Sequence, residues 1–293
     1  MRRVFTAASL LTVSALLLSG CSAGQEVDDG LIGVVASTNV YGDIAQTIGG
    51  DLVEVTSLIN DPSQDPHSFE GDARNQLALS KAEVVIENGG GYDDFIGTLL
   101  SGAGNQDARV IDAVELSGYT GDGLNEHVWF DLPTVLKVAE ALAAEYSELA
   151  PGSSEIFVAN LAEFTAGIND LEAKEAAVAA SGAGVVMTEP VAGYLLEATG
   201  FTDVTPPKFS AAIEAESEVP PLVLQQSLDL VRSDRVQLLV YNEQTTGAAT
   251  DQLLAAAKAA GLPVVPVAET LPEGIHYLDW ISATIDAVAE AVQ

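Results

Sequence analysis

The chain has 293 residues, 48% of them hydrophobic and 18% charged, a balance typical of a globular protein long enough for two domains. Its formal net charge is −32, from 43 acidic and 11 basic side chains. Such an acidic protein has no basic surface to neutralise phosphates, which excludes nucleic-acid binding and charge-driven docking on anionic lipid. The charge attracts cations, although acidic side chains also serve simply to keep a surface soluble.

The first 20 residues have the pattern of an export signal peptide, with two arginines after Met1 and then an apolar run. This run ends in LSGC at residues 18–21, which resembles the bacterial lipobox, in which the cysteine becomes the first mature residue and carries lipid. Cys21 is the only cysteine, so an internal disulfide is excluded. The alternative is an incidental cysteine behind an ordinary signal peptide.

Residues 21–30 are small and polar, and we interpret them as a tether. No later stretch reaches the roughly 18 continuous apolar residues that a membrane-spanning helix needs. We therefore expect the mature protein to be anchored to a membrane by its N-terminal lipid and not to span it.

From residue 31 onward, the patterns of strand and helix alternate along the chain. The expected strands lie at residues 31–38, 51–59, 83–89, 108–114, 184–189, 236–243 and 263–269. The expected helices lie at residues 40–49, 75–82, 92–103, 131–149, 192–200, 220–233, 248–261 and 278–292, besides one longer helix. This alternation predicts an α/β fold with two Rossmann-like lobes, in which helices cover both faces of parallel sheets.

The longer helical pattern begins at Ser153 or Ser154 and ends at Ala180. Apolar residues recur in it at spacings of four and three, and Glu175 occupies the one slot where another apolar residue is expected. A helix of about 26 residues measures roughly 39 Å, long enough to connect two lobes. We predict an N-terminal lobe over residues 31–152, a linking helix over 153–181 and a C-terminal lobe over 182–293.

Two helix starts carry candidate caps. Thr38 and Asn39 precede the helix at 40–49 and have side chains suited to capping it. Asp131 is a candidate N-cap for the helix at 131–149, and Pro133 lies in the first turn, where its missing N–H costs little.

Candidate metal ligands lie where strands are expected to end, which is where ligands bind in open α/β sheets. His67 follows the strand at 51–59, Glu189 and Glu269 end two strands of the second lobe, and His127 precedes the helix at 131–149. Two neutral imidazoles and two carboxylates balance a divalent cation, and the set contains no thiolate. The four residues lie far apart in the sequence and form no compact metal-binding motif. Their spacing alone is therefore weak evidence for a metal site.

The segments around these residues resemble those of the zinc/manganese solute-binding lipoproteins of bacterial ABC transporters. DPHSFE at 65–70, followed by a helix and a strand ending in Asn-Gly, resembles the D-P-H-x-Y/F-E signature of that family. NEHVWFDL at 125–132 resembles its N-P-H-V-W-x-D-P signature. Two further segments with family-like patterns are MTEPVAGYLLEATGF at 187–201 and ETLPEGIHYLDWI at 269–281.

The resemblance implies that His67, His127, Glu189 and Glu269 coordinate a transported divalent metal, either zinc or manganese. Zinc-uptake members of the family commonly have a histidine at the position of Glu189, whereas many manganese-type members have a glutamate. Glu189 therefore disfavours the usual zinc-uptake type. Asp65 is a candidate partner that orients an imidazole.

Other features of these segments qualify the assignment. Glu126 and Leu132 stand where the family usually has prolines on either side of the second histidine. His276 lies in the same region as Glu269 and is a rival fourth ligand. We interpret Trp129 and Trp280 as packing anchors at the lobe interface.

The function implied by the resemblance is that of a membrane-tethered extracytoplasmic receptor, which we expect to be a monomer without catalytic activity. It would capture the metal between its lobes and deliver it to a separately encoded permease and ATPase, and the long helix would restrain lobe motion. Two alternatives remain at this point. One is a lipoprotein metallohydrolase, which needs an open coordination position and a general base. The other is a surface adhesin with a structural metal.

Overall fold

The computed structural model describes residues 30–61, 69–121 and 123–292. The expected signal peptide and tether, with Cys21, and the proposed site residues Asp65 and His67 lie outside the described residues. The chain divides into two compact units, Met1–Gly30 and Leu31–Gln293.

The first sheet has four parallel strands in the order β2-β1-β3-β4. These strands are β1 (Ile32–Thr38), β2 (Val53–Ile59), β3 (Val84–Glu87) and β4 (Arg109–Asp112). Strand β1 is buried along almost its whole length, as expected for a parallel strand covered on both faces. The strand order reverses beside β1, so the carboxyl ends of β1 and β3 form a switch point where ligands can bind.

The second sheet is also parallel, with the order β6-β5-β7-β8. Its strands are β5 (Gly184–Met187), β6 (Thr202–Asp203), β7 (Val236–Asn242) and β8 (Val264–Val267). The predicted α/β class with two parallel sheets is confirmed. Strand β6 was not predicted, because two residues are too few to show an alternating pattern.

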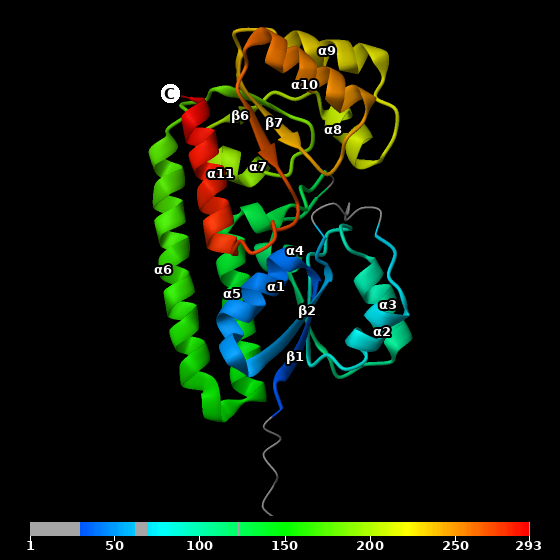
Figure 1. Ribbon diagram of the computed structural model, residues 1–293, viewed down its shortest axis with the longest axis vertical. Helices are drawn as coiled ribbons and strands as arrows, with labels where there is room; N and C mark the ends of the chain where they lie inside the picture. Colours follow the sequence, from blue (N-terminus) through cyan, green and yellow to red (C-terminus); the bar gives the residue numbers. More distant parts are fainter. Residues whose placement is uncertain (1–29, 62–68, 122, 293) are drawn as a thin grey trace, which may run out of the picture. The chain divides into compact units, whose positions relative to one another are not determined.

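Helices cover both sheets (Figure 1). In the first half of the chain they are α1 (Asn39–Gly49), α2 (Ala73–Leu79), α3 (Phe95–Ala103), α4 (Ala113–Ser117), α5 (Leu132–Leu149) and α6 (Ser154–Val178). In the second half they are α7 (Gly193–Ala198), α8 (Pro207–Glu214), α9 (Pro221–Val231), α10 (Ala248–Ala260) and α11 (Tyr277–Ala291). Short 3-10 helices lie at η1 (Gly50–Leu52), η3 (Val128–Phe130) and η4 (Pro151–Ser153). No helix within the described residues is both long and apolar enough to span a membrane.

The long helix α6 has 25 residues and measures roughly 37 Å, close to the predicted length. It packs against α5 and α1, and α11 lies alongside it (Figure 1). Since α11 also contacts α1, the last helix of the chain returns to the first sheet's side of the molecule. The lobe boundaries at residues 152 and 182 stay a prediction.

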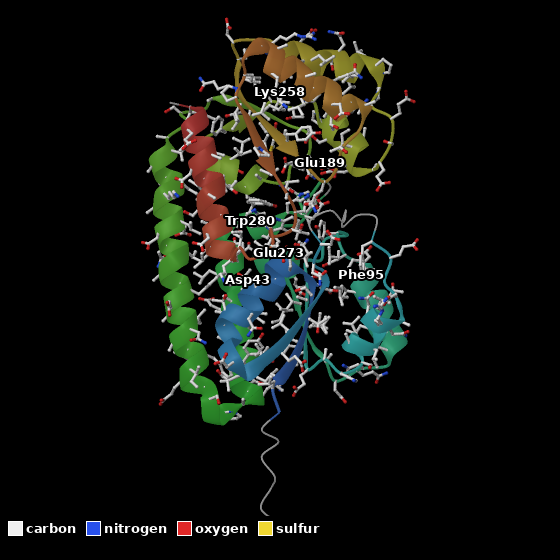
Figure 2. All side chains as sticks on the ribbon, viewed as in Figure 1. Asp43, Phe95, Glu189, Lys258, Glu273 and Trp280 are labelled. Carbon is white, nitrogen blue, oxygen red and sulfur yellow. The ribbon has the colours of Figure 1, made fainter. Side chains whose placement is uncertain are left out.

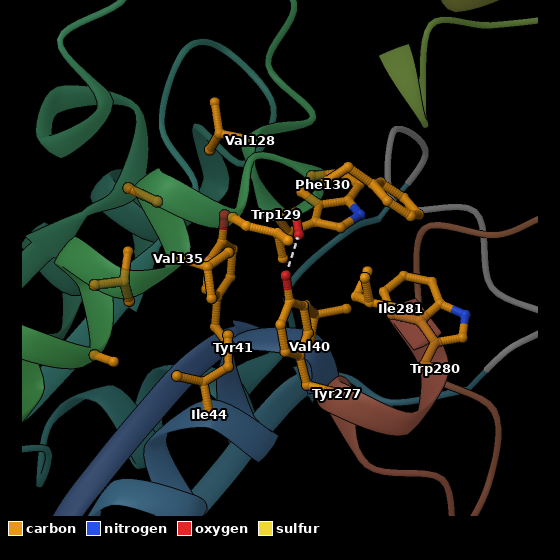
Figure 3. Packing of buried hydrophobic residues seen from close by; sticks show 14 of the residues in the cluster. Val40, Tyr41, Ile44, Val128, Trp129, Phe130, Val135, Tyr277, Trp280 and Ile281 are labelled. Carbon is orange, nitrogen blue, oxygen red and sulfur yellow. Dashed lines mark hydrogen bonds between the residues drawn. The ribbon is translucent and has the colours of Figure 1, made fainter. Parts of the chain in front are cut away.

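One hydrophobic cluster includes buried residues from both sheets and from α5, α6 and α11. At its centre, the Tyr277 hydroxyl donates to the carbonyl of Trp129 at 2.7 Å, and the rings of Phe130 and Trp280 lie 5.1 Å apart (Figure 3). Aromatic pairs of this kind contribute about 0.5–1.5 kcal/mol beyond the area they bury. Both tryptophans are therefore buried packing residues, as the sequence indicated.

The two predicted helix caps have different outcomes. The Asp131 carboxylate accepts a hydrogen bond from the backbone N–H of Thr134 at 3.1 Å, which confirms it as the N-cap of α5. The prediction for α1 was wrong, because Thr38 occupies the N-cap position without a side-chain bond and Asn39 is already helical. The Asn39 amide instead bonds both the N–H and the carbonyl of Leu271, each at 2.9 Å.

Candidate metal site

Three acidic or amide side chains converge at the switch point of the second sheet. Glu189 lies two residues beyond β5, Asn242 is the last residue of β7, and Glu269 lies two residues beyond β8. All three side chains are at most 1% exposed. Figure 2 shows Glu189 on the side of the second sheet that faces the first lobe. Because the carboxyl ends of parallel strands meet at one edge of the sheet, Glu189 and Glu269 lie close together although they are 80 positions apart in sequence.

The two carboxylates are joined by one amide. Asn242 Nδ2 donates to Glu269 Oε1 at 2.8 Å and also to Glu189 Oε2. The same nitrogen lies 3.1 Å from the hydroxyl of Thr245. This bridge holds the two acidic side chains next to each other, although like charges buried side by side repel.

His127 reaches the same place from the first lobe and is fully buried. Its Nδ1 lies 2.7 Å from Asn125 Oδ1, while Asn125 Nδ2 donates to the Pro190 carbonyl at 2.9 Å. Because the amide nitrogen of Asn125 faces a carbonyl, its oxygen faces His127 and accepts, so Nδ1 carries the imidazole proton. The lone pair is then on Nε2, the nitrogen suited to a metal, and this atom lies 4.0 Å from Glu269 Oε2.

The Asn-Gly pair at the end of β3 positions the loop that carries His127. The Asn88 amide donates to the carbonyl of Glu126 at 2.9 Å and accepts from the Tyr41 hydroxyl at 2.5 Å. Gly89 has φ +76°, and a Cβ there would lie 2.3 Å from the Asp112 carboxylate. Only glycine fits this turn, which explains the pair in physical terms.

Tyr92 connects the first lobe to Glu269. Its hydroxyl donates to Glu269 Oε2 at 2.9 Å, and its ring packs against Trp129 with centroids 5.0 Å apart. Burial, together with the neighbouring Glu269 carboxylate, raises the pKa of the Tyr92 phenol well above its ordinary value. Tyr92 therefore stays neutral and acts as a hydrogen-bond donor to the carboxylate.

Gln244 fixes the backbone of the same glutamate. Its Oε1 accepts from the N–H of Glu269 at 2.5 Å, and its Nε2 donates to the Thr270 hydroxyl at 3.0 Å. Gln244 also lines a cavity of about 600 Å³ between the α8–α9 connection and the start of α10. His127, Glu189 and Glu269 do not line this cavity, so the buried group is a separate feature.

The sequence predicted three of the residues in this buried group and missed those that hold them. His127, Glu189 and Glu269 are brought together, whereas the structural description does not extend to His67 and Asp65. The missed residues are Tyr92, Asn125, Asn242 and Gln244. For Asn242, a usable signal was its place at the end of a predicted strand in the second lobe.

His276, the rival ligand, lies in a different setting. Its side chain is 77% exposed, and its Nδ1 lies 2.7 Å from Asp43 Oδ1. The other oxygen of Asp43 accepts from the backbone N–H of Tyr277 at 2.8 Å. The hydrogen bond with Asp43 raises the pKa of His276 above its ordinary value of 6.5. His276 therefore belongs to a surface pair at the start of α11.

The match to a protein family spans nearly all of this fold. A family model described as zinc-uptake complex component A, periplasmic, matches residues 34–291. The chain belongs to this family.

Individual relatives agree with this assignment to the zinc-uptake component A family. The chain is 28% identical to the manganese-binding lipoprotein MntA of Halalkalibacterium halodurans over 206 residues, covering 67% of this chain and 68% of MntA. It is 23% identical to the manganese ABC transporter substrate-binding lipoprotein PsaA of Streptococcus mitis, covering 97% of each. The periplasmic zinc binding protein TroA from Treponema pallidum has the same fold, with a TM-score of 0.74, 20% identity, and coverage of 90% of this chain and 99% of TroA.

Proposed function

We propose that this protein is an extracytoplasmic receptor that captures a divalent transition metal, zinc or manganese, and delivers it to the permease and ATPase of an ABC transporter. The observation that carries the proposal is the buried group of one imidazole and two carboxylates, contributed by both lobes. Its presence in a chain of the zinc-uptake component A family favours metal capture over a metallohydrolase. The proposed ligands are His67, His127, Glu189 and Glu269.

The chemistry of this group suits a divalent cation. Burying two carboxylates is costly unless a positive charge balances them. A 2+ ion coordinated by two carboxylates and neutral imidazoles forms a neutral unit, so binding replaces the repulsion between Glu189 and Glu269 with attraction to the ion. The imidazole of His127 is already oriented by Asn125 with its proton on Nδ1, so Nε2 needs no tautomeric change before it binds the metal.

The ligand types permit both candidate metals. MntA and PsaA are named for manganese, and TroA is named for zinc. A site of imidazoles and carboxylates binds Zn²⁺ more tightly than Mn²⁺ in the usual order of stability, so the metal carried in the cell depends also on which one is available. We infer that the site accepts both ions and that Zn²⁺ displaces Mn²⁺.

Titration calorimetry with Mn²⁺ and with Zn²⁺ tests the proposal. The wild-type protein should bind one ion per chain, and His67→Ala or Glu269→Gln should weaken binding by well over about tenfold, because each removes a ligand. Glu273→Gln is the matched control, since Glu273 is exposed in the same segment. A wild-type protein that binds neither ion, or a Glu269→Gln variant with unchanged affinity, would refute the assignment.

We also propose that Cys21 carries the lipid that anchors the receptor, as the lipobox-like sequence at 18–21 indicates. MntA and PsaA are both named as lipoproteins. Cys21→Ser should move the protein from the membrane fraction to the soluble fraction of the expressing cells, because the acyl chains supply the membrane affinity. If the variant stays with the membranes, the lipid-anchor proposal is wrong.

A further inference from the structure

Asn125, which faces His127 in the first lobe, is held by the segment of the second lobe that directly follows Glu189. The side-chain nitrogen of Asn125 donates to the Pro190 carbonyl at 2.9 Å, and its backbone carbonyl accepts from the Tyr194 hydroxyl at 2.7 Å. Its side-chain oxygen lies 2.7 Å from His127 Nδ1 and accepts from the His127 backbone N–H at 3.2 Å. One residue therefore connects the second lobe to the proposed ligand of the first.

Gly193, the first residue of α7, lets this segment approach Asn125 closely. A Cβ at Gly193 would lie 2.8 Å from the Asn125 side-chain nitrogen, a separation that real Cβ atoms do not show. The amide would have to move, because both polar atoms of this short side chain are already hydrogen-bonded. Gly193 does not have a positive φ, so an alanine there would cause no backbone strain. The cost of a side chain at this position therefore falls on Asn125.

The ring of Tyr194 is itself fixed by a second tyrosine from the first lobe. Tyr119 stacks on it with ring centroids 5.1 Å apart and an angle of 9° between the ring planes. The Tyr119 hydroxyl donates to Asp131 Oδ1 at 3.3 Å, and Asp131 is the N-cap of α5. The stack therefore holds the Tyr194 hydroxyl at the carbonyl of Asn125.

The surroundings of Asn125 leave its amide room to rotate. A cavity of about 440 Å³ is lined by Asn125 together with Pro190, Gly193 and Tyr194. If the amide turned its nitrogen toward His127, Nδ1 would have to accept and the imidazole proton would move to Nε2. Since Nε2 is the nitrogen that faces Glu269, this tautomer could not use it to bind a metal. The hold on Asn125 therefore keeps His127 ready for coordination.

We propose that Gly193 and Tyr194 are positioning residues for His127. By holding Asn125, they keep the imidazole of the first lobe in the tautomer that binds metal. The inference rests on the proposed function and deepens it, because it makes the affinity of the site depend on a contact between the lobes. When that contact breaks, Asn125 loses both of its bonds to the second lobe and His127 becomes a weaker ligand, which assists release of the ion.

Gly193→Ala tests the close approach, with Zn²⁺ calorimetry as the first measurement. Binding should weaken by about tenfold, because the added Cβ displaces the partner that orients the ligating histidine. The matched control is Gly97→Ala, a helical position of α3 where a Cβ would meet nothing within 4 Å. The second measurement is nitrogen NMR of the neutral His127 ring in the metal-free protein. It should show the proton on Nδ1 in the wild type and a shift toward Nε2 in Gly193→Ala, a change that a purely structural role would not cause.

Tyr194→Phe tests the same hold without adding an atom. It keeps the ring stack and removes only the hydroxyl that donates to Asn125, so Zn²⁺ binding should weaken by about 3–10-fold. Tyr146→Phe is the matched control, because it also removes a hydroxyl bonded to a backbone carbonyl, that of Ala45 at 3.4 Å, within the first lobe. Its affinity should equal that of the wild type.

The outcomes separate this inference from the proposed function. If the wild type binds Zn²⁺ and both test variants bind as tightly as their controls, the positioning role is refuted while metal capture stands. A loss of affinity in Gly193→Ala with the His127 proton still on Nδ1 would also overturn it, because the effect would not pass through the tautomer. A wild-type protein that binds no Zn²⁺ overturns both proposals.

Discussion

At the scale of single residues, two asparagine side chains hold the proposed ligands in position through hydrogen bonds. Asn125 fixes the tautomer of His127 and is itself held by the Pro190 carbonyl. Asn242 places one nitrogen between Glu189 and Glu269. Amides suit both tasks because they donate and accept without adding charge to a site that already buries two carboxylates.

Asn125→Ala should weaken metal binding by about 10–100-fold, since partners that orient a ligating histidine typically contribute that much. Calorimetry with Zn²⁺ measures the effect. Asn160→Ala is a suitable control, because it also removes one side-chain bond to a backbone carbonyl, that of Ile48, outside the site. Equal affinities for Asn125→Ala and the control would contradict the proposed role of Asn125.

The candidate ligands could be predicted from the sequence, whereas Asn125 and Asn242, which orient them, could not. Glu189 and Glu269 stood out as acids at predicted strand ends, a local feature. Asn242 bonds partners 53 and 27 positions away, and Asn125 bonds one 65 positions away. Pairings of that kind depend on how the strands are arranged in space, which no spacing within one segment reveals.

At the scale of elements, the long helix α6 contains one buried acidic side chain, that of Glu175. Glu175 interrupts the apolar stripe of α6, and the structure buries it to 5% exposure. Its Oε1 has no hydrogen-bond partner among the described residues. Burial, with smaller contributions from Glu172 and Asp131, raises the pKa of Glu175 from 4.5 to about 8. The folded protein therefore holds this proton more tightly than the unfolded chain.

The raised pKa predicts a pH-dependent stability. Because the folded-state pKa exceeds the unfolded value, Glu175 lowers the free energy of unfolding as the pH rises from about 4.5 to about 8. Glu175→Gln should therefore be more stable than the wild type at pH 8, by about 1–2 kcal/mol after allowance for solvent screening, and nearly equal to it at pH 5.

Urea unfolding at the two pH values measures this difference. Glu163→Gln, at an exposed position of the same helix, should leave the pH dependence unchanged. An equal gain from Glu175→Gln at pH 5 and pH 8 would argue against a buried, proton-binding carboxyl.

At the scale of elements, the longest helix was predicted most accurately, and some of the short elements were missed. The apolar stripe placed α6 within about two residues at each end, because seven turns repeat the same periodicity. Helix α4 and strand β6 were missed, since 5 and 2 residues contain too few repeats. Helix α8, with 8 residues, was also missed, although the shorter helices α2 and α7 were predicted. Asn39 was misjudged as a cap because its partner, Leu271, lies 232 positions away.

On the scale of the whole second unit, the segment from Glu269 to Tyr277 is tied to the first lobe. Asn39 bonds Leu271, and Asp43 bonds Tyr277. Tyr92 adds a third connection by donating to Glu269. Each hydrogen bond contributes about 0.5–1.5 kcal/mol, and together with the shared core they favour the restrained lobe motion that the sequence resemblance implied.

The most direct test of the central claim is the position of the bound ion. Crystals grown with Zn²⁺ should show one strong anomalous peak about 2.0–2.2 Å from His127 Nε2 and from a carboxylate oxygen of both Glu189 and Glu269. A peak that lies away from these three residues, or a protein that crystallises without Zn²⁺ under saturating conditions, would contradict the account.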